Sequence, residues 1–110
     1  RFFETLVRLD PFYALETPTL LGLAYYLKGR YEDAAKVLEQ GVSRRPDIPD
    51  CHVALAATYT QMGRMEDASR EAALIARLDP FFDLEYFGTA FKNPADRNAI
   101  LKGLRKAGVK

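Results

Sequence analysis

Asp50, Cys51 and His52 are adjacent in this chain of 110 residues, and their side chains are of types that do chemistry. A carboxylate, a thiol and an imidazole together suggest a metal site or an activated nucleophile. His52 is the only histidine and Cys51 the only cysteine, so no second group of ligands accompanies them. We expect His52 to be a surface or packing residue and Cys51 to pack as a small apolar side chain. The sequence predicts no catalytic residue, no metal and no cofactor.

The composition indicates a folded domain without strong global charge. Apolar residues make up 48% and charged residues 28%, and the net charge is +1. Such a balance argues against disorder, and it creates no field that would recruit nucleic acid or a membrane surface. A single cysteine excludes an internal disulfide and is typical of a reducing compartment, so we expect a cytoplasmic protein. No apolar run is long enough to cross a membrane.

The elements around these residues follow an internal repeat, in which residues 15–48 recur as residues 49–82 at an offset of 34. The identical pairs are Leu21/Leu55, Tyr25/Tyr59, Gly29/Gly63, Arg30/Arg64, Glu32/Glu66, Asp33/Asp67, Ala34/Ala68 and Pro46/Pro80. A period of this length is typical of helix–turn–helix units that bury their apolar faces by stacking on one another.

Each repeat is predicted to be a pair of helices. Glycine suits the left-handed residue that closes the first helix of a pair, and proline prevents the second helix from continuing. The first repeat is expected to contain helices from Pro18 to Gly29 and from Tyr31 to Ser43. In the second repeat, the first helix is expected to end at about Met62 and the second to run from Glu66 to Arg77. Beyond Pro80 we expect a short helix capped by Asp83 and a final helix capped by Asn93, which starts at Pro94 and ends near Ala107.

This pattern resembles the tetratricopeptide repeat, whose motif has a small residue at position eight, Tyr at eleven, Ala at twenty and Pro at thirty-two. The matching residues are Gly22, Tyr25, Ala34 and Pro46, then Ala56, Tyr59, Ala68 and Pro80. The fourth position departs from the motif, with Pro18 and His52 in place of an aromatic residue, and the twenty-fourth holds Leu38 or Ala72. The resemblance implies an all-α, right-handed superhelix of antiparallel helix pairs that binds proteins and is not an enzyme.

The domain organisation follows from the repeat. Residues 1–14 are expected to be the orphan second helix of a preceding repeat with a linker, and residues 83–110 a broken third unit with a C-terminal capping helix. Two complete repeats, 15–48 and 49–82, lie between them. Gly103 inside the last helix costs about 1 kcal/mol relative to Ala, so this helix should fray unless it is packed.

The resemblance also implies a concave groove that binds a partner. Its lining positions in the two repeats are Glu16, Thr19, Leu23 and Tyr26, then Asp50, Val53, Ala57 and Thr60, and Tyr86 and Phe87 extend it. Aromatic and small apolar residues with acids at the rim suit an extended peptide or an amphipathic helix. The alternative is that Tyr26, Phe87 and their neighbours pack against the terminal helix and leave no open groove.

The tail is basic, with six Lys or Arg residues and one acid over residues 91–110. We expect these charges to lie on a solvated helix face, without binding nucleic acid or membrane. Residues 91–96 and 101–108 resemble the C-terminal end of the repeat region in bacterial class III adenylate/guanylate cyclases. That resemblance implies a fragment of a larger bacterial signalling protein, and the alternative function is a regulatory or oligomerisation tail of such an enzyme.

The chain begins at Arg1 within an apolar helical pattern. If this first helix lacks a partner, its apolar side chains are exposed, and exposed apolar patches drive association. We therefore expect self-association of the chain. The residues concerned are Phe2, Phe3, Leu6 and Val7.

Overall fold

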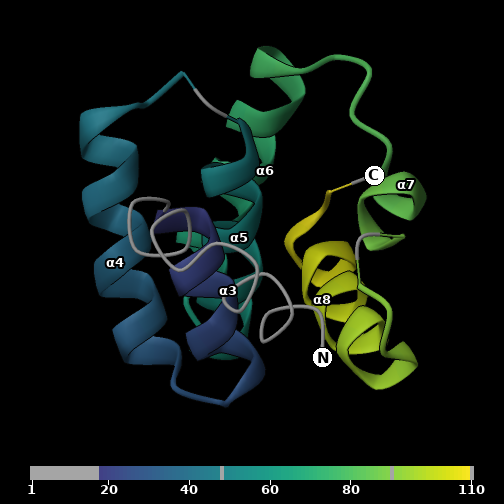
Figure 1. Cartoon of the computed structure of the whole chain (residues 1–110). Coiled ribbons are helices and arrows are strands. Elements are labelled where there is room, and N and C mark those ends of the chain that lie inside the picture. Colours follow the sequence, from purple (N-terminus) through teal and green to yellow (C-terminus); the bar gives the residue numbers. More distant parts are fainter. Residues whose placement is uncertain (1–17, 48, 90, 110) are drawn as a thin grey trace.

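The fold is a stack of helix pairs, seen in a computed structural model that describes residues 18–47, 49–89 and 91–109 (Figure 1). Every regular element in these ranges is a helix, so the all-α prediction is confirmed for the described residues. The orphan helix expected over residues 1–14 lies outside these ranges. So do Glu16 and the residues expected to mediate self-association, Phe2, Phe3, Leu6 and Val7.

Two antiparallel pairs form the body of the molecule. The first pair is α3 (Pro18–Leu27) with α4 (Tyr31–Arg44), and the second is α5 (Pro49–Gln61) with α6 (Met65–Leu78). Gly29 and Gly63 close the first helix of each pair with φ angles of 79° and 77°. Residues that have a Cβ rarely adopt this backbone conformation. The glycine turns predicted from the repeat are therefore present.

The small residues of the motif allow the paired helices to approach closely. A Cβ on Gly22 would lie 2.4 Å from side-chain atoms of Leu38, so α3 could not pack this closely on α4 with a larger residue there. Ala34, Ala56 and Ala68 are completely buried at the equivalent contacts. The first helix of each pair thus lies against the second along a line of small side chains.

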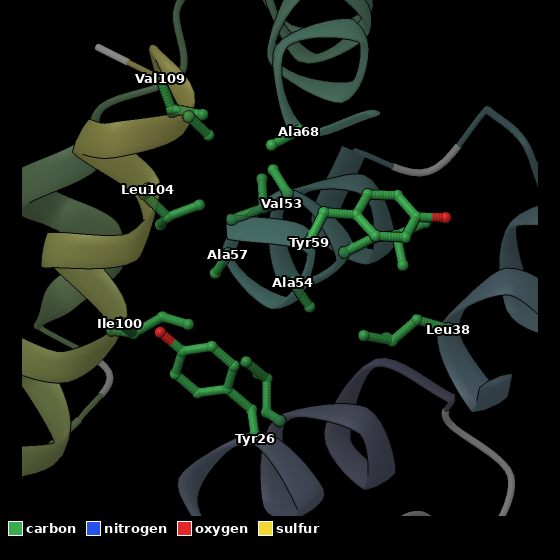
Figure 2. Close-up of a cluster of buried hydrophobic side chains, with 14 of the residues drawn as sticks. Tyr26, Leu38, Val53, Ala54, Ala57, Tyr59, Ala68, Ile100, Leu104 and Val109 are labelled. Atoms are coloured by element: carbon green, nitrogen blue, oxygen red, sulfur yellow. The ribbon is translucent and has the colours of Figure 1, made fainter. Parts of the chain in front are cut away.

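Helix α5 is the centre of the molecule, because every residue from Cys51 to Thr60 is buried. Helices α3, α4, α6 and α8 (Pro94–Ala107) all pack against it. Figure 2 shows Leu38, Ala68 and Leu104 facing α5 from three different helices. Apolar residues therefore occur on every side of α5, and the buried hydroxyls of Thr58 and Thr60 donate hydrogen bonds to carbonyl oxygens of the same helix.

Helix α8 lies along α5, whereas its contact with α6 is smaller. Asn93 caps it by accepting hydrogen bonds from the backbone N–H groups of Ala95 and Asp96, and Gly108 closes it with a φ of 98°. A Cβ on Gly103 would lie 2.7 Å from the Tyr26 hydroxyl and 3.4 Å from the Cβ of Ala57, so this glycine is packed against both α3 and α5. The close approach of α8 to these helices explains why α8 tolerates a glycine in its interior.

A short helix, α7 (Leu84–Gly88), precedes α8 and packs against it. Asp83 caps α7 by accepting a hydrogen bond from Tyr86 N at 3.2 Å, as its position in the sequence predicted. The guanidinium of Arg97 in α8 donates hydrogen bonds to the carbonyl oxygens of Gly88 and Phe91. These bonds hold the backbone at Gly88 and at Phe91 against α8.

Candidate functional site

The inner face of the second repeat is covered by α8. Val53 and Ala57 are completely buried, and Thr60 is buried and donates its hydroxyl to Ala56 O within its own helix. Ile100 and Leu104 of α8 lie on the same side of α5 (Figure 2). These three predicted groove positions therefore present no surface to a partner in this structure.

Tyr26 also contacts α8. Its hydroxyl donates a hydrogen bond of 2.9 Å to Ala99 O, and Gln61 Nε2 donates to the same hydroxyl at 3.2 Å. The ring is 3% exposed and packs edge-on against Tyr31. Burial raises the pKa of Tyr26 to about 12, because the charged phenolate would lose its hydration there. Tyr26 thus joins the first repeat to α8, as in the alternative interpretation of the sequence.

The other predicted groove residues within the described ranges come together around one pocket of about 580 Å³. It lies between α3, the start of α5, and the segment from Asp79 to Phe91. We call it the aromatic pocket. Its lining residues are Thr19, Leu20, Leu23, Asp50, Asp79, Phe81, Phe82, Asp83, Tyr86, Phe87, Thr89 and Phe91.

Aromatic rings form much of this pocket and differ in depth. Phe91 is buried, and a row of rings leads outward from it through Phe87 to Phe82, with centroid separations of 5.7 and 5.8 Å. At the mouth, Phe81 is 92% exposed and Tyr86 is 76% exposed. Large apolar side chains with so much exposure beside a pocket are typical of a surface that binds a partner.

Three carboxylates stand among the lining residues, and no basic side chain does so in the described part of the chain. Asp50 occupies the first turn of α5, where the helix dipole favours a negative charge. Asp79 accepts a hydrogen bond from Phe81 N, and Asp83 accepts one from Tyr86 N. Asp79 and Asp83 therefore also hold the backbone that presents the two exposed rings.

Sequence reasoning found part of this pocket and missed the rest. The groove positions implied by the resemblance included Thr19, Leu23, Asp50, Tyr86 and Phe87. They did not include the loop residues Asp79, Phe81, Phe82 and Asp83. The signal that could have indicated these loop residues is the aromatic run between Pro80 and Phe91, which is more apolar than a connecting loop needs to be.

His52 is buried with only 2% exposure and packs between helices. Its Nδ1 lies 2.5 Å from Glu71 Oε1 on α6, and its Nε2 lies 2.8 Å from Pro46 O. Both ring nitrogens face oxygen acceptors, so both can donate only when the ring is protonated. The expected packing role fits this position, but a polar link between α6 and the end of the first repeat was not predicted.

Cys51 is buried as well, with its Sγ 3.4 Å from Leu38 O. Burial raises the pKa of its thiol, which disfavours the reactive thiolate. Among the described residues, no three His, Cys, Asp or Glu side chains gather as a metal site would require.

Antiparallel helix pairs that repeat a motif and stack through small residues define the class of the molecule: an all-α helical-repeat protein. The family model described as tetratricopeptide repeat matches residues 25–88, more than half of the chain. The chain therefore belongs to the tetratricopeptide repeat family. The match ends at Gly88 and does not extend to the tail.

A search of curated proteins found no match to the chain. In the described residues, no helix combines the length and the apolar character that a membrane crossing needs.

Proposed function

We propose that the chain is a non-catalytic protein–protein interaction module that binds a peptide segment or a helix in the aromatic pocket. Its family suggests protein partners. The single observation that carries the proposal is the position of Phe81 and Tyr86, both largely exposed at the mouth of the pocket. A partner that covers these two rings removes them from water, which contributes favourably to the free energy of binding.

The proposal moves the binding surface away from the centre of the expected groove. Helix α8 already covers Val53 and Ala57, and within the described residues the inner face is open to a partner near α3 and α7. There the wall consists of Thr19 and Leu23, and the opposite side carries the aromatic row. An extended segment or one turn of an amphipathic helix fits a site of this size.

A selection from a library of random displayed peptides tests the proposal. The purified chain is the target, and the recovered peptides are measured against Tyr86→Ser and against the control Met65→Ser. Met65 lies on α6, is also exposed at 42%, and does not line the pocket. We expect Tyr86→Ser to weaken binding at least tenfold and Met65→Ser to leave it unchanged. Recovery of no peptide, or equal binding to both variants, contradicts the proposal.

Three further expectations are not tested by the described residues. Self-association through Phe2, Phe3, Leu6 and Val7 stays a prediction, and sedimentation at high concentration that shows only monomer would contradict it. Membership of a larger bacterial signalling protein, such as a nucleotide cyclase, and a cytoplasmic location also stay predictions.

A further inference from the structure

We propose that the partner segment carries an aromatic or long aliphatic side chain flanked by arginines, and that it binds the aromatic pocket through both features. This inference rests on the proposed function and adds the chemistry of the ligand. It is carried by the charge of the pocket, since the described lining contains three carboxylates and no basic group. A partner of opposite charge is the complement of such a surface.

The three carboxylates are available to an incoming cation. Asp79 and Asp83 each bond a backbone N–H through Oδ1, which leaves the lone pairs of the second carboxylate oxygen. Asp50 is exposed in the first turn of α5. No ion pair in the described residues joins any of the three to a Lys or Arg side chain. Several acids elsewhere are paired, as Glu85 with Arg105 and Asp33 with Arg30 show.

The exposed rings favour arginine over lysine in the partner. A planar guanidinium stacks on an aromatic face and at the same time bonds a carboxylate with two N–H groups. This chain already uses the same combination, because Arg64 lies 4.3 Å from the centroid of Tyr59 and 2.8 Å from Asp67. Tyr86 and Asp83 both line the pocket, and no arginine lines it in the described residues, so a ring and a carboxylate are present there for an arginine of the partner.

The apolar anchor follows from the depth of the pocket. Phe82 and Phe87 are half-buried and Phe91 is buried, so the site has an apolar interior behind a charged rim. A side chain that enters this interior exchanges water for ring contacts, which is favourable in proportion to the apolar surface covered. Arginines beside the anchor stay at the rim, where water and the carboxylates both reach them.

The test uses two synthetic peptides labelled with fluorescein. The first carries Phe and Leu four positions apart with Arg beside each, and the second has Gln in place of every Arg. Fluorescence anisotropy measures their binding to the whole chain at low salt. We expect the Arg peptide to bind about tenfold more tightly than the Gln peptide, and this preference to fall as salt is raised.

Charge variants of the chain locate the effect. Asp50→Asn should weaken binding of the Arg peptide about threefold and leave binding of the Gln peptide unchanged. Glu66→Gln is the matched control, because Glu66 is also an exposed acid in the first turn of a helix but does not line the pocket. It should change neither affinity. Thermal melts of both variants check that the fold is preserved.

The outcomes separate this inference from the proposed function. Equal affinity for the two peptides, or an equal response to Asp50→Asn and Glu66→Gln, overturns the inference. If the displayed peptides nevertheless lose binding with Tyr86→Ser, the proposed function stands with a different ligand chemistry. If an acidic version of the peptide binds more tightly than the Arg peptide, the charge argument is wrong.

Discussion

The two repeats share one motif but leave different parts of their inner faces open. In the second repeat, α8 covers Val53 and Ala57, whereas in the first repeat Thr19 and Leu23 line the aromatic pocket. The motif residues themselves are arranged alike, as the glycine turns at 29 and 63 show. The motif therefore builds the helix pair, and the segment that follows the last pair decides which surface remains for a partner.

The repeats also differ in how they fill the space between their helices. The first repeat places Gly22 against Leu38, and the equivalent positions of the second hold Ala56 and Ala72. The first repeat thus pairs a small residue with a large one, whereas the second repeat has two small residues at the equivalent positions. The second repeat has the buried pair His52 and Glu71, where the equivalent positions of the first hold Pro18 and Val37. Each difference predicts a measurable asymmetry.

The largest effect is expected at the contact between Gly22 and Leu38. Leu38→Ala removes a completely buried side chain and should lower the free energy of unfolding by about 2–5 kcal/mol. Gly22→Ala alone should cost about 1–3 kcal/mol from overpacking, less about 1 kcal/mol gained in helix propensity. The double variant reproduces the Ala pair of the second repeat, so the two costs should not add.

Urea denaturation of the four proteins measures this cycle. We expect a favourable coupling of about 1–2 kcal/mol in the double variant, because the added methyl group occupies part of the space that Leu38 vacates. Ala56→Gly is the control in the second repeat, because the equivalent of Leu38 there is Ala72 and no large side chain can fill the space left by the lost methyl group. Strict additivity of the two changes in the first repeat would show that the compensation does not exist.

The next effect concerns Tyr26, which joins the first repeat to α8. Its folded-state pKa of about 12 lies above its ordinary value of 10, so the unfolded chain loses this proton first as pH rises. The contribution of neutral Tyr26 to the free energy of unfolding is present in full below about pH 10 and is lost as pH rises toward about 12. It amounts to about 2–3 kcal/mol for a shift of this size.

The measurement compares the wild type with Tyr26→Phe by urea denaturation between about pH 8 and pH 11, a range that spans the ordinary pKa of tyrosine in the unfolded chain. The wild type should lose stability more steeply than the variant over the upper part of that range. Tyr59 is present in both proteins, and its pKa is also raised by burial and by its bond to Glu39, so its effect cancels. Parallel pH profiles would show that Tyr26 is not buried against α8.

A smaller effect is expected from the buried polar pair of the second repeat. Glu71→Ala leaves Nδ1 of buried His52 without its carboxylate and should cost about 2 kcal/mol. Glu71→Gln keeps an acceptor and should cost less. Val37→Ala is the matched change in the first repeat and should cost about 1 kcal/mol, since it removes only part of a half-buried apolar side chain. Denaturation midpoints that rank Val37→Ala as the more damaging change would contradict the role given to the pair.

The fold could be predicted from the sequence because its signals are local. Gly29 and Gly63 mark their turns through the backbone conformation they allow, and the period of 34 residues places them without knowledge of tertiary contacts. The site was only partly predictable. The position of α8 depends on Gly103 meeting Tyr26 and Ala57, contacts between distant parts of the chain that periodicity does not contain.

The smallest predicted effect tests whether the motif acts alike in the two repeats. Arg30 lies 4.9 Å from the centroid of Tyr25, and Arg64 lies 4.3 Å from that of Tyr59. These guanidinium groups are exposed, so replacing either arginine by Ala should cost less than about 1 kcal/mol. Arg64 also lies 3.7 Å from Glu39 on α4 and so links the two repeats, whereas Arg30 bonds within its own repeat.

Arg64→Ala should therefore cost slightly more than Arg30→Ala, and Glu39→Gln should remove the difference. Thermal melts of the two arginine variants, each with and without Glu39→Gln, measure this directly. If the difference persists without the carboxylate, it comes from the aromatic stacking, and the two turns are not equivalent although both contain Gly followed by Arg. If it disappears, the motif contributes equally to both repeats, and only contacts between repeats distinguish them.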